Sequence, residues 1–246
     1  MFTENTEIKA IIKENPLAAY FLQKQGVDYI AYKDMPLSKA CSLLNKSSEK
    51  VLRYLNLHDP NIYKQDKDFT RLSVNRLARY LKECHHEYIK EKLPFIESKL
   101  KYISGNYHQL KPLIQTFTAF KSALLEHIYY EEDMLFPYLS ELQHCLDDND
   151  VNVVELFNAT NIYSIDIFVE NHSQVDEEVY QIQLRLQESL TGLIDDMHVP
   201  IILGEIDALI IDLEEHALLE DDILVNKARK LESMVHDKLT KFALLN

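Results

Sequence analysis

The sequence predicts an all-α protein in which an antiparallel four-helix bundle follows a small helical N-terminal domain. Only four glycines and seven prolines occur among 246 residues, whereas a sheet protein needs turn residues about every 8–12 positions. Hydrophobic residues make up 46% of the chain, and over four long stretches they recur at the spacing of a helix face. A chain of this length can also bury a substantial core.

We expect the N-terminal domain to span residues 1–57 and to consist of short helices. Pro16 suits the first turn of one helix, and Gly26 suits the left-handed position just past its end. Residues 58–69 are polar and contain a proline, so we interpret them as a linker. The bundle domain is then expected to occupy residues 70–246.

The bundle is expected to form from four long helical patterns. They cover residues 73–103, 108–144, 162–190 and 200–239. Pro112 fits the first turn of the second helix, and Pro137 is predicted to kink or end that helix. The fourth pattern is either one helix or two successive helices. Short connections between long helices are typical of antiparallel neighbours in a bundle.

Charge and cysteine content exclude several classes of protein. A formal net charge of −14 argues against nucleic-acid binding, which needs a basic surface. No apolar run reaches the ~18–20 residues that span a bilayer, and no secretory signal is visible at the N-terminus. Cys41, Cys84 and Cys145 lack any Cys-x-x-Cys spacing and suit a reducing compartment. We therefore expect a soluble cytoplasmic protein.

One sequence motif occurs twice. The segment that begins at His127 reads HIYYEEDMLF, and the segment that begins 89 residues later at His216 reads HALLEDDILV. Each places a glutamate, Glu131 or Glu220, four residues after its histidine. On an α-helix this spacing puts both side chains on one face. Two such faces together would offer two imidazoles and two carboxylates to a common centre.

The apolar neighbours of the motif indicate that this centre is buried. The flanking apolar residues at helical spacing are Phe120, Leu124, Met134 and Leu135 in the first copy and Leu209, Leu213, Ile223 and Leu224 in the second. A buried ionised carboxylate is costly unless it is paired or binds metal. A salt bridge is the alternative, but no lysine or arginine lies on either stripe near the pair. The pattern therefore predicts a metal site.

Further ligands should come from the other two helices. His172 lies on a good apolar stripe of the third helix. On the first helix, the apolar positions before the adjacent pair favour His85, and those after it favour His86. The separation of 86 residues between His86 and His172 resembles the 89 residues between the two motifs. This comparison gives His86 a modest preference, and periodicity alone leaves both histidines open.

The expected donor set favours a particular kind of metal. Four imidazoles and two carboxylates suit two transition-metal ions bridged by the carboxylates, and iron is the leading candidate over manganese. The absence of cysteine near the motif argues against a structural zinc site. Such a centre would keep positions open for small molecules.

At these residues the sequence resembles the hemerythrin-like family with the HHE cation-binding motif, and more closely its repair-of-iron-centres subfamily. The resemblance rests on Leu93-Pro94 seven residues after His86, on Leu135-Phe136-Pro137, on Glu170-Asn171-His172, and on both His-x-x-x-Glu motifs. It implies a non-haem di-iron centre, compatible with an oxo bridge. The implied terminal ligands are His86, His127, His172 and His216, and the implied bridging carboxylates are Glu131 and Glu220.

The resemblance also implies a function in the nitrosative and oxidative stress response. Members of the subfamily support repair of damaged iron–sulfur clusters, so NO or O2 and iron–sulfur client proteins are the implied partners. Ile30 and Ala31 occupy the two places where the subfamily has adjacent cysteines. That departure favours the alternative of an NO or O2 sensor without repair activity. Turnover of peroxide or NO, and a homodimer, are also left open.

Overall fold

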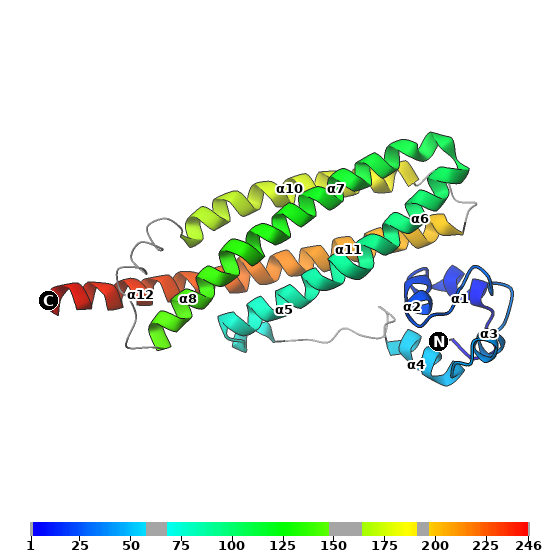
Figure 1. Ribbon diagram of the computed structural model, residues 1–246, viewed down its shortest axis with the longest axis horizontal. Helices are drawn as coiled ribbons and strands as arrows, with labels where there is room; N and C mark the ends of the chain where they lie inside the picture. The colour runs from blue at the N-terminus through cyan, green and yellow to red at the C-terminus, as the bar shows by residue number, and fades with distance from the viewer. Residues whose placement is uncertain (1, 58–67, 148–163, 191–196, 246) are drawn as a thin grey trace.

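A computed structural model of the protein describes residues 2–57, 68–147, 164–190 and 197–245. Figure 1 shows long antiparallel helices beside a group of short helices that comes first in the chain. The predicted all-α class and the four-helix bundle are confirmed. No helix in these ranges combines the length and the apolar composition needed to cross a bilayer.

Four helical runs form the bundle in the described part of the chain. The first comprises α5 (Val74–Glu87), η2 (Tyr88–Lys92) and α6 (Leu93–Asn106), and the second comprises α7 (Lys111–Tyr130), η4 (Glu131–Leu135) and α8 (Phe136–Asp147). The third is α10 (Ile165–Leu190), and the fourth comprises α11 (His198–Leu218), η5 (Leu219–Leu224) and α12 (Val225–Leu245). The fourth pattern is thus one continuous run. Residues 148–163, which connect the second and third runs, lie outside the described residues.

Three of the four runs contain a π-helical turn near their middle. At the end of η2, η4 and η5 a backbone N–H donates to the carbonyl five residues earlier rather than four. The bonds run from Leu93 to Tyr88, from Phe136 to Glu131 and from Val225 to Glu220. Each turn accommodates one extra residue, which rotates the following helix face by roughly 100° relative to an uninterrupted α-helix.

Prolines follow two of these π-turns. Pro94 is the second residue of α6, and Pro137 is the second residue of α8. The prediction that Pro137 ends the helix is wrong, because α8 continues to Asp147. A proline lacks the N–H that an α-helix needs at this position, and the π-turn has already interrupted the regular bonding there. After the third π-turn, the side-chain amide of Asn226 donates to the carbonyl of Asp222 at 2.7 Å.

The bundle core consists of two apolar clusters separated along the helix axes. One contains Leu81, Leu135 and Leu224, and the other contains Leu93 and Leu124. On the first, second and fourth runs the change from one cluster to the other falls at the π-turn or within a few residues of it. Polar side chains in this middle layer are therefore enclosed from both ends by apolar packing.

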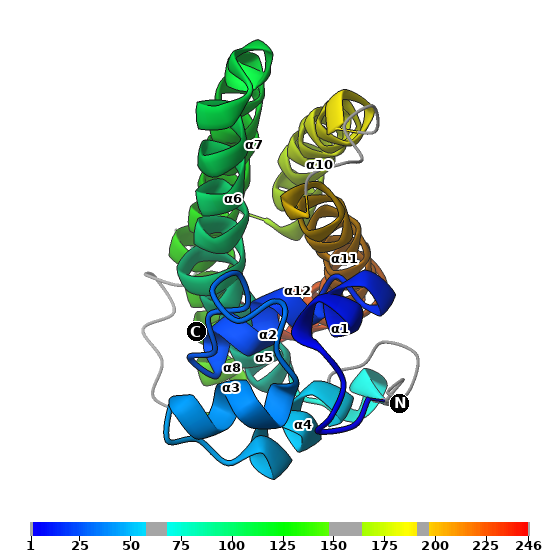
Figure 2. The same ribbon diagram turned by 90° about the vertical axis from the view of Figure 1, so that its right-hand side faces the viewer.

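The short helices at the N-terminus pack against one end of the bundle (Figure 2). They are α1 (Ile8–Glu14), α2 (Ala18–Lys24), α3 (Leu37–Leu43) and α4 (Ser48–Leu57). The left-handed conformation expected of Gly26 is confirmed by its φ of 70°. The core of these helices includes two bundle residues, Phe95 and Ile201. The Tyr20 hydroxyl also donates to Glu91 at 2.7 Å. Most of the predicted linker, residues 58–67, lies outside the described residues.

Glu205 is a buried carboxylic acid on α11, with 4% of its surface exposed. Burial raises its pKa to about 8, the nearby charge of Asp212 adds to this, and Lys92 opposes it. The folded state therefore favours the protonated form. Below pH 4.5 Glu205 is protonated in both the folded and the unfolded state. As pH rises from 4.5 to about 8, the unfolded state ionises first, so the stability that the protonated Glu205 contributes is lost over this range.

The substitution Glu205→Gln is expected to stabilise the metal-free protein at pH 8, because glutamine keeps the shape and does not ionise. The pKa shift corresponds to an increase of at most about 4 kcal/mol in the free energy of unfolding at pH 8. This increase should fall towards zero at pH 4.5. Urea denaturation at several pH values measures it. Glu188→Gln, at an exposed glutamate on α10, is the control. Equal stability of wild type and Glu205→Gln at pH 8 would contradict the prediction.

Candidate metal centre

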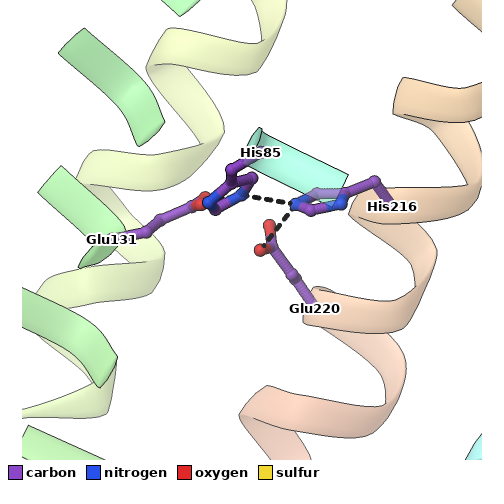
Figure 3. Close-up of side chains that lie close together, drawn as sticks. All are labelled: His85, Glu131, His216 and Glu220. Carbon is purple, nitrogen blue, oxygen red and sulfur yellow. Dashed lines mark hydrogen bonds and ion pairs between the residues drawn. The ribbon is translucent and has the colours of Figure 1, made fainter. Parts of the chain in front are cut away.

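Four buried side chains converge in the middle layer of the bundle (Figure 3). They are His85 from α5, Glu131 from η4, His216 from α11 and Glu220 from η5. One ligand atom from each lies within 4.8 Å of one ligand atom from every other. Both carboxylates are fully buried. Of the doubled motif, Glu131, His216 and Glu220 lie in this group, whereas His127 lies outside it and contacts Glu131.

Glu131 lies between two imidazoles that come from different helices. Its Oε2 is 3.0 Å from Nε2 of His85, and its Oε1 is 2.8 Å from Nε2 of His127. Each oxygen of one carboxylate therefore faces its own histidine. Glu131 thus joins a histidine of the first run to a histidine of its own run.

The second copy of the motif completes the other side of the centre. Nε2 of His216 is 3.1 Å from Oε1 of Glu220 and 3.0 Å from Nε2 of His85. Burial by itself lowers the pKa of His216, but Glu220, Cys84 and Glu131 raise it, to about 10. A cation bound here would have to displace that proton, because a histidine binds metal through a deprotonated nitrogen.

On the first run, His85 and not the predicted His86 lies in the group of four. His85 is 1% exposed, whereas His86 is exposed and lies outside the group. The physical reason is the π-turn η2, which adds one residue between this pair and the apolar positions of α6. With that insertion His85, and not His86, shares a face with Leu93. The π-turn η4 has the same effect on the second run. Met134, which was predicted on the core stripe, lies within this turn and is 47% exposed.

His172 lies on α10, the helix for which it was predicted. Its side chain is outside the described part of the structure. The role expected of His172 as a ligand therefore stays a prediction.

Glu132 is a site residue that sequence reasoning did not single out. Its Oε1 is 2.9 Å from Nδ1 of His85. A carboxylate on one ring nitrogen fixes the tautomer and leaves the lone pair of the other nitrogen for a metal. The available signal was the second acid of the motif, which directly follows Glu131 and recurs as Asp221.

The substitution Glu132→Ala is expected to weaken metal binding by about 10- to 100-fold without removing a ligand. The reason is that His85 loses the group that orients its ring. Titration of metal against a competing chelator measures the affinity. Glu126→Ala, at an exposed glutamate on the same run, is the matched control. An affinity of Glu132→Ala equal to that of Glu126→Ala would show that the contact has no orienting role.

The donor set fits a metal cation by its chemistry and by its spacing. Metal–nitrogen and metal–oxygen bonds are about 2.1 Å long, so two ligands of one ion lie within about 4.2 Å of each other. The observed limit of 4.8 Å is close to this value. Imidazole nitrogens and carboxylate oxygens together suit first-row transition metals. Without a cation, burial of two carboxylates in an apolar layer is costly.

Fold and site together define a class of protein, the helical bundles that hold metal cations on histidines and glutamates from facing helices. A family model described as the hemerythrin HHE cation binding domain matches residues 77–228. This is more than half of the chain, which therefore belongs to the hemerythrin HHE cation-binding family.

Two relatives carry the same descriptive name, iron-sulfur cluster repair protein ScdA. The one from Staphylococcus haemolyticus is 23% identical over 146 residues, which is 58% of this chain and 65% of that relative. The one from Staphylococcus epidermidis is 21% identical over 159 residues, covering 63% of this chain and 71% of that relative. The chain is thus similar, at low identity, to proteins named for cluster repair.

Proposed function

We propose that this protein binds two iron ions and supports the repair of damaged iron–sulfur clusters by donating iron. The observation that carries the proposal is the position of Glu131 between His85 and His127. A carboxylate with one oxygen on each of two histidine sets suits a bridged pair of ions better than a single ion. The names of the two Staphylococcus relatives support cluster repair as the process served.

The proposed ligands come from all four runs of the bundle. They are His85, His127, Glu131, His172, His216 and Glu220, and His85 replaces His86 of the expectation from sequence. Bound iron would supply exchangeable positions for NO or O2 and a store of metal for a client. Apolar clusters enclose this layer from both ends of the bundle, and Glu132 orients the ring of His85.

The N-terminal helices are proposed to form a domain that docks on the bundle and presents the protein to iron–sulfur clients. Ile30 and Ala31 occupy the places of the subfamily's cysteine pair. Their backbone N–H groups each donate a hydrogen bond of 3.0 Å to Asp28 Oδ1. Cys41 cannot replace the missing thiols, because it is fully buried and burial raises its pKa. This observation supports a second candidate function, an NO or O2 sensor without repair activity.

A repair assay separates the two functions. A dehydratase whose [4Fe–4S] cluster has been damaged by NO is incubated with the iron-loaded protein, and recovered activity is measured. The controls are metal-free protein and an equal amount of free ferrous salt. We expect the iron-loaded protein to restore activity faster than the salt. No recovery, together with an NO-dependent change in association with a client protein, would replace the repair function with the sensor.

A further inference from the structure

A pocket of about 490 Å³ opens on the flank of the bundle beside the metal centre. Its walls come from α5 and η2 on one side and from α11 and η5 on the other. Tyr88 and Cys84 line it, and so does His216. The pocket therefore reaches from the surface to a proposed ligand of the centre.

Acidic side chains dominate this pocket. Four carboxylates line it, those of Glu87, Asp212, Glu215 and Asp222, against one ammonium group, Lys92. The carboxylates and the ammonium of the lining sum to −3, to which His216 adds at most one positive charge, and the single ammonium forms an ion pair with Asp212. Glu87, Glu215 and Asp222 are exposed, which places negative charge at the rim.

His216 connects the acidic pocket with the centre. Its ring is only 6% exposed, and its Nε2 faces His85 and Glu220. Nδ1 of the same ring is buried without a conventional hydrogen bond to any described residue, although the Cys84 thiol beside it helps to raise the pKa of the ring. A cation that has crossed the rim thus meets a ligand residue of the centre on the pocket wall.

We propose that this pocket is the path by which ferrous ions reach and leave the centre. The inference rests on the proposed function and deepens it, because donation requires iron to move between the centre and the solvent. A cleft lined by charges of one sign concentrates ions of the opposite sign and raises their association rate. Carboxylate oxygens are suitable transient ligands for a hydrated divalent cation. The same field repels small anions, so the path favours iron exchange over anionic substrates.

The test combines charge removal with two probes of opposite charge. The pocket variant carries Glu87→Gln, Glu215→Gln and Asp222→Asn. The control variant carries Glu141→Gln, Glu177→Gln and Glu188→Gln, three exposed glutamates that do not line the pocket. Stopped-flow absorbance follows Fe2+ uptake by the metal-free full chain and azide binding by the iron-loaded full chain, each at low and high ionic strength.

We expect the pocket variant to take up Fe2+ about tenfold more slowly than wild type at low ionic strength, with the difference shrinking in high salt. Azide should bind to it faster, and the control variant should behave as wild type. Unchanged Fe2+ uptake by the pocket variant, or slower Fe2+ uptake together with slower azide binding, would show that the pocket is not the path for iron. Normal iron content in those cases would leave the proposed function intact, whereas a wild-type protein that takes up no iron would overturn both.

Discussion

Replacing Glu131 with alanine is expected to remove nearly all bound metal from the protein. Its two oxygens face His85 and His127 at 3.0 and 2.8 Å, so the substitution removes the one carboxylate that contacts both histidines. We expect about two iron ions per chain in the wild type and almost none in the variant, since loss of even an outer partner weakens binding by about 10- to 100-fold. Metal analysis with the visible spectrum measures the loss.

The stability of the protein provides a second measurement for the same variant. A metal that binds only the folded state raises the melting temperature with its concentration. This increase should be present in wild type and in Glu126→Ala and absent from Glu131→Ala. Glu220→Ala should behave like Glu131→Ala, because Glu220 is the matching residue of the second motif. Normal iron content in both glutamate variants would remove the basis for the metal centre.

Alanine substitutions at the adjacent histidines are expected to differ sharply in effect. His85→Ala should lose most of the bound iron, because its Nε2 lies 3.0 Å from both Glu131 and His216. His86→Ala should retain it, because the side chain is exposed and outside the group. The two variants differ by one position in the chain and are therefore matched controls for each other.

Iron content, affinity against a chelator and circular dichroism of both variants would complete this comparison. Equal helix content would show that any loss of metal reflects the ligand and not the fold. The reverse result, with iron lost from His86→Ala and kept by His85→Ala, would mean that the helix register at η2 follows the uninterrupted α-helix. It would also restore the ligand expected from the family resemblance.

Much of the architecture follows from the sequence. The scarcity of glycine and proline and the four long periodic stretches predict the bundle, because they need only the average geometry of an α-helix. The His-x-x-x-Glu spacing likewise places His127 beside Glu131 and His216 beside Glu220. Residues four positions apart are separated by about one turn of an α-helix and therefore lie on the same face. Repetition of the motif on apolar stripes then indicates that the two pairs share a buried centre.

The choice between His85 and His86 required the tertiary structure. The backbone N–H of Leu93 donates to the carbonyl of Tyr88, whereas in an α-helix it would donate to the carbonyl of the next residue along the chain. The local apolar pattern does not distinguish these two bonds. Packing selects the π-turn, because it lets the apolar faces of both α5 and α6 point into the bundle. The sequence did contain an indication of the π-turn. Apolar positions before the histidine pair favoured His85, whereas those after it favoured His86.

The remaining features depend on contacts between distant segments. The bond from Glu132 to His85 joins residues 47 positions apart, and the acidic pocket joins α5 with α11. No helical period relates such residues, so only their arrangement in space brings them together. By itself the sequence determined the helices, the bundle and the two histidine–glutamate pairs. Tertiary packing decided which histidine of the first run joins Glu131, His216 and Glu220 and where the pocket beside them opens, because both depend on the rotation of whole helix faces.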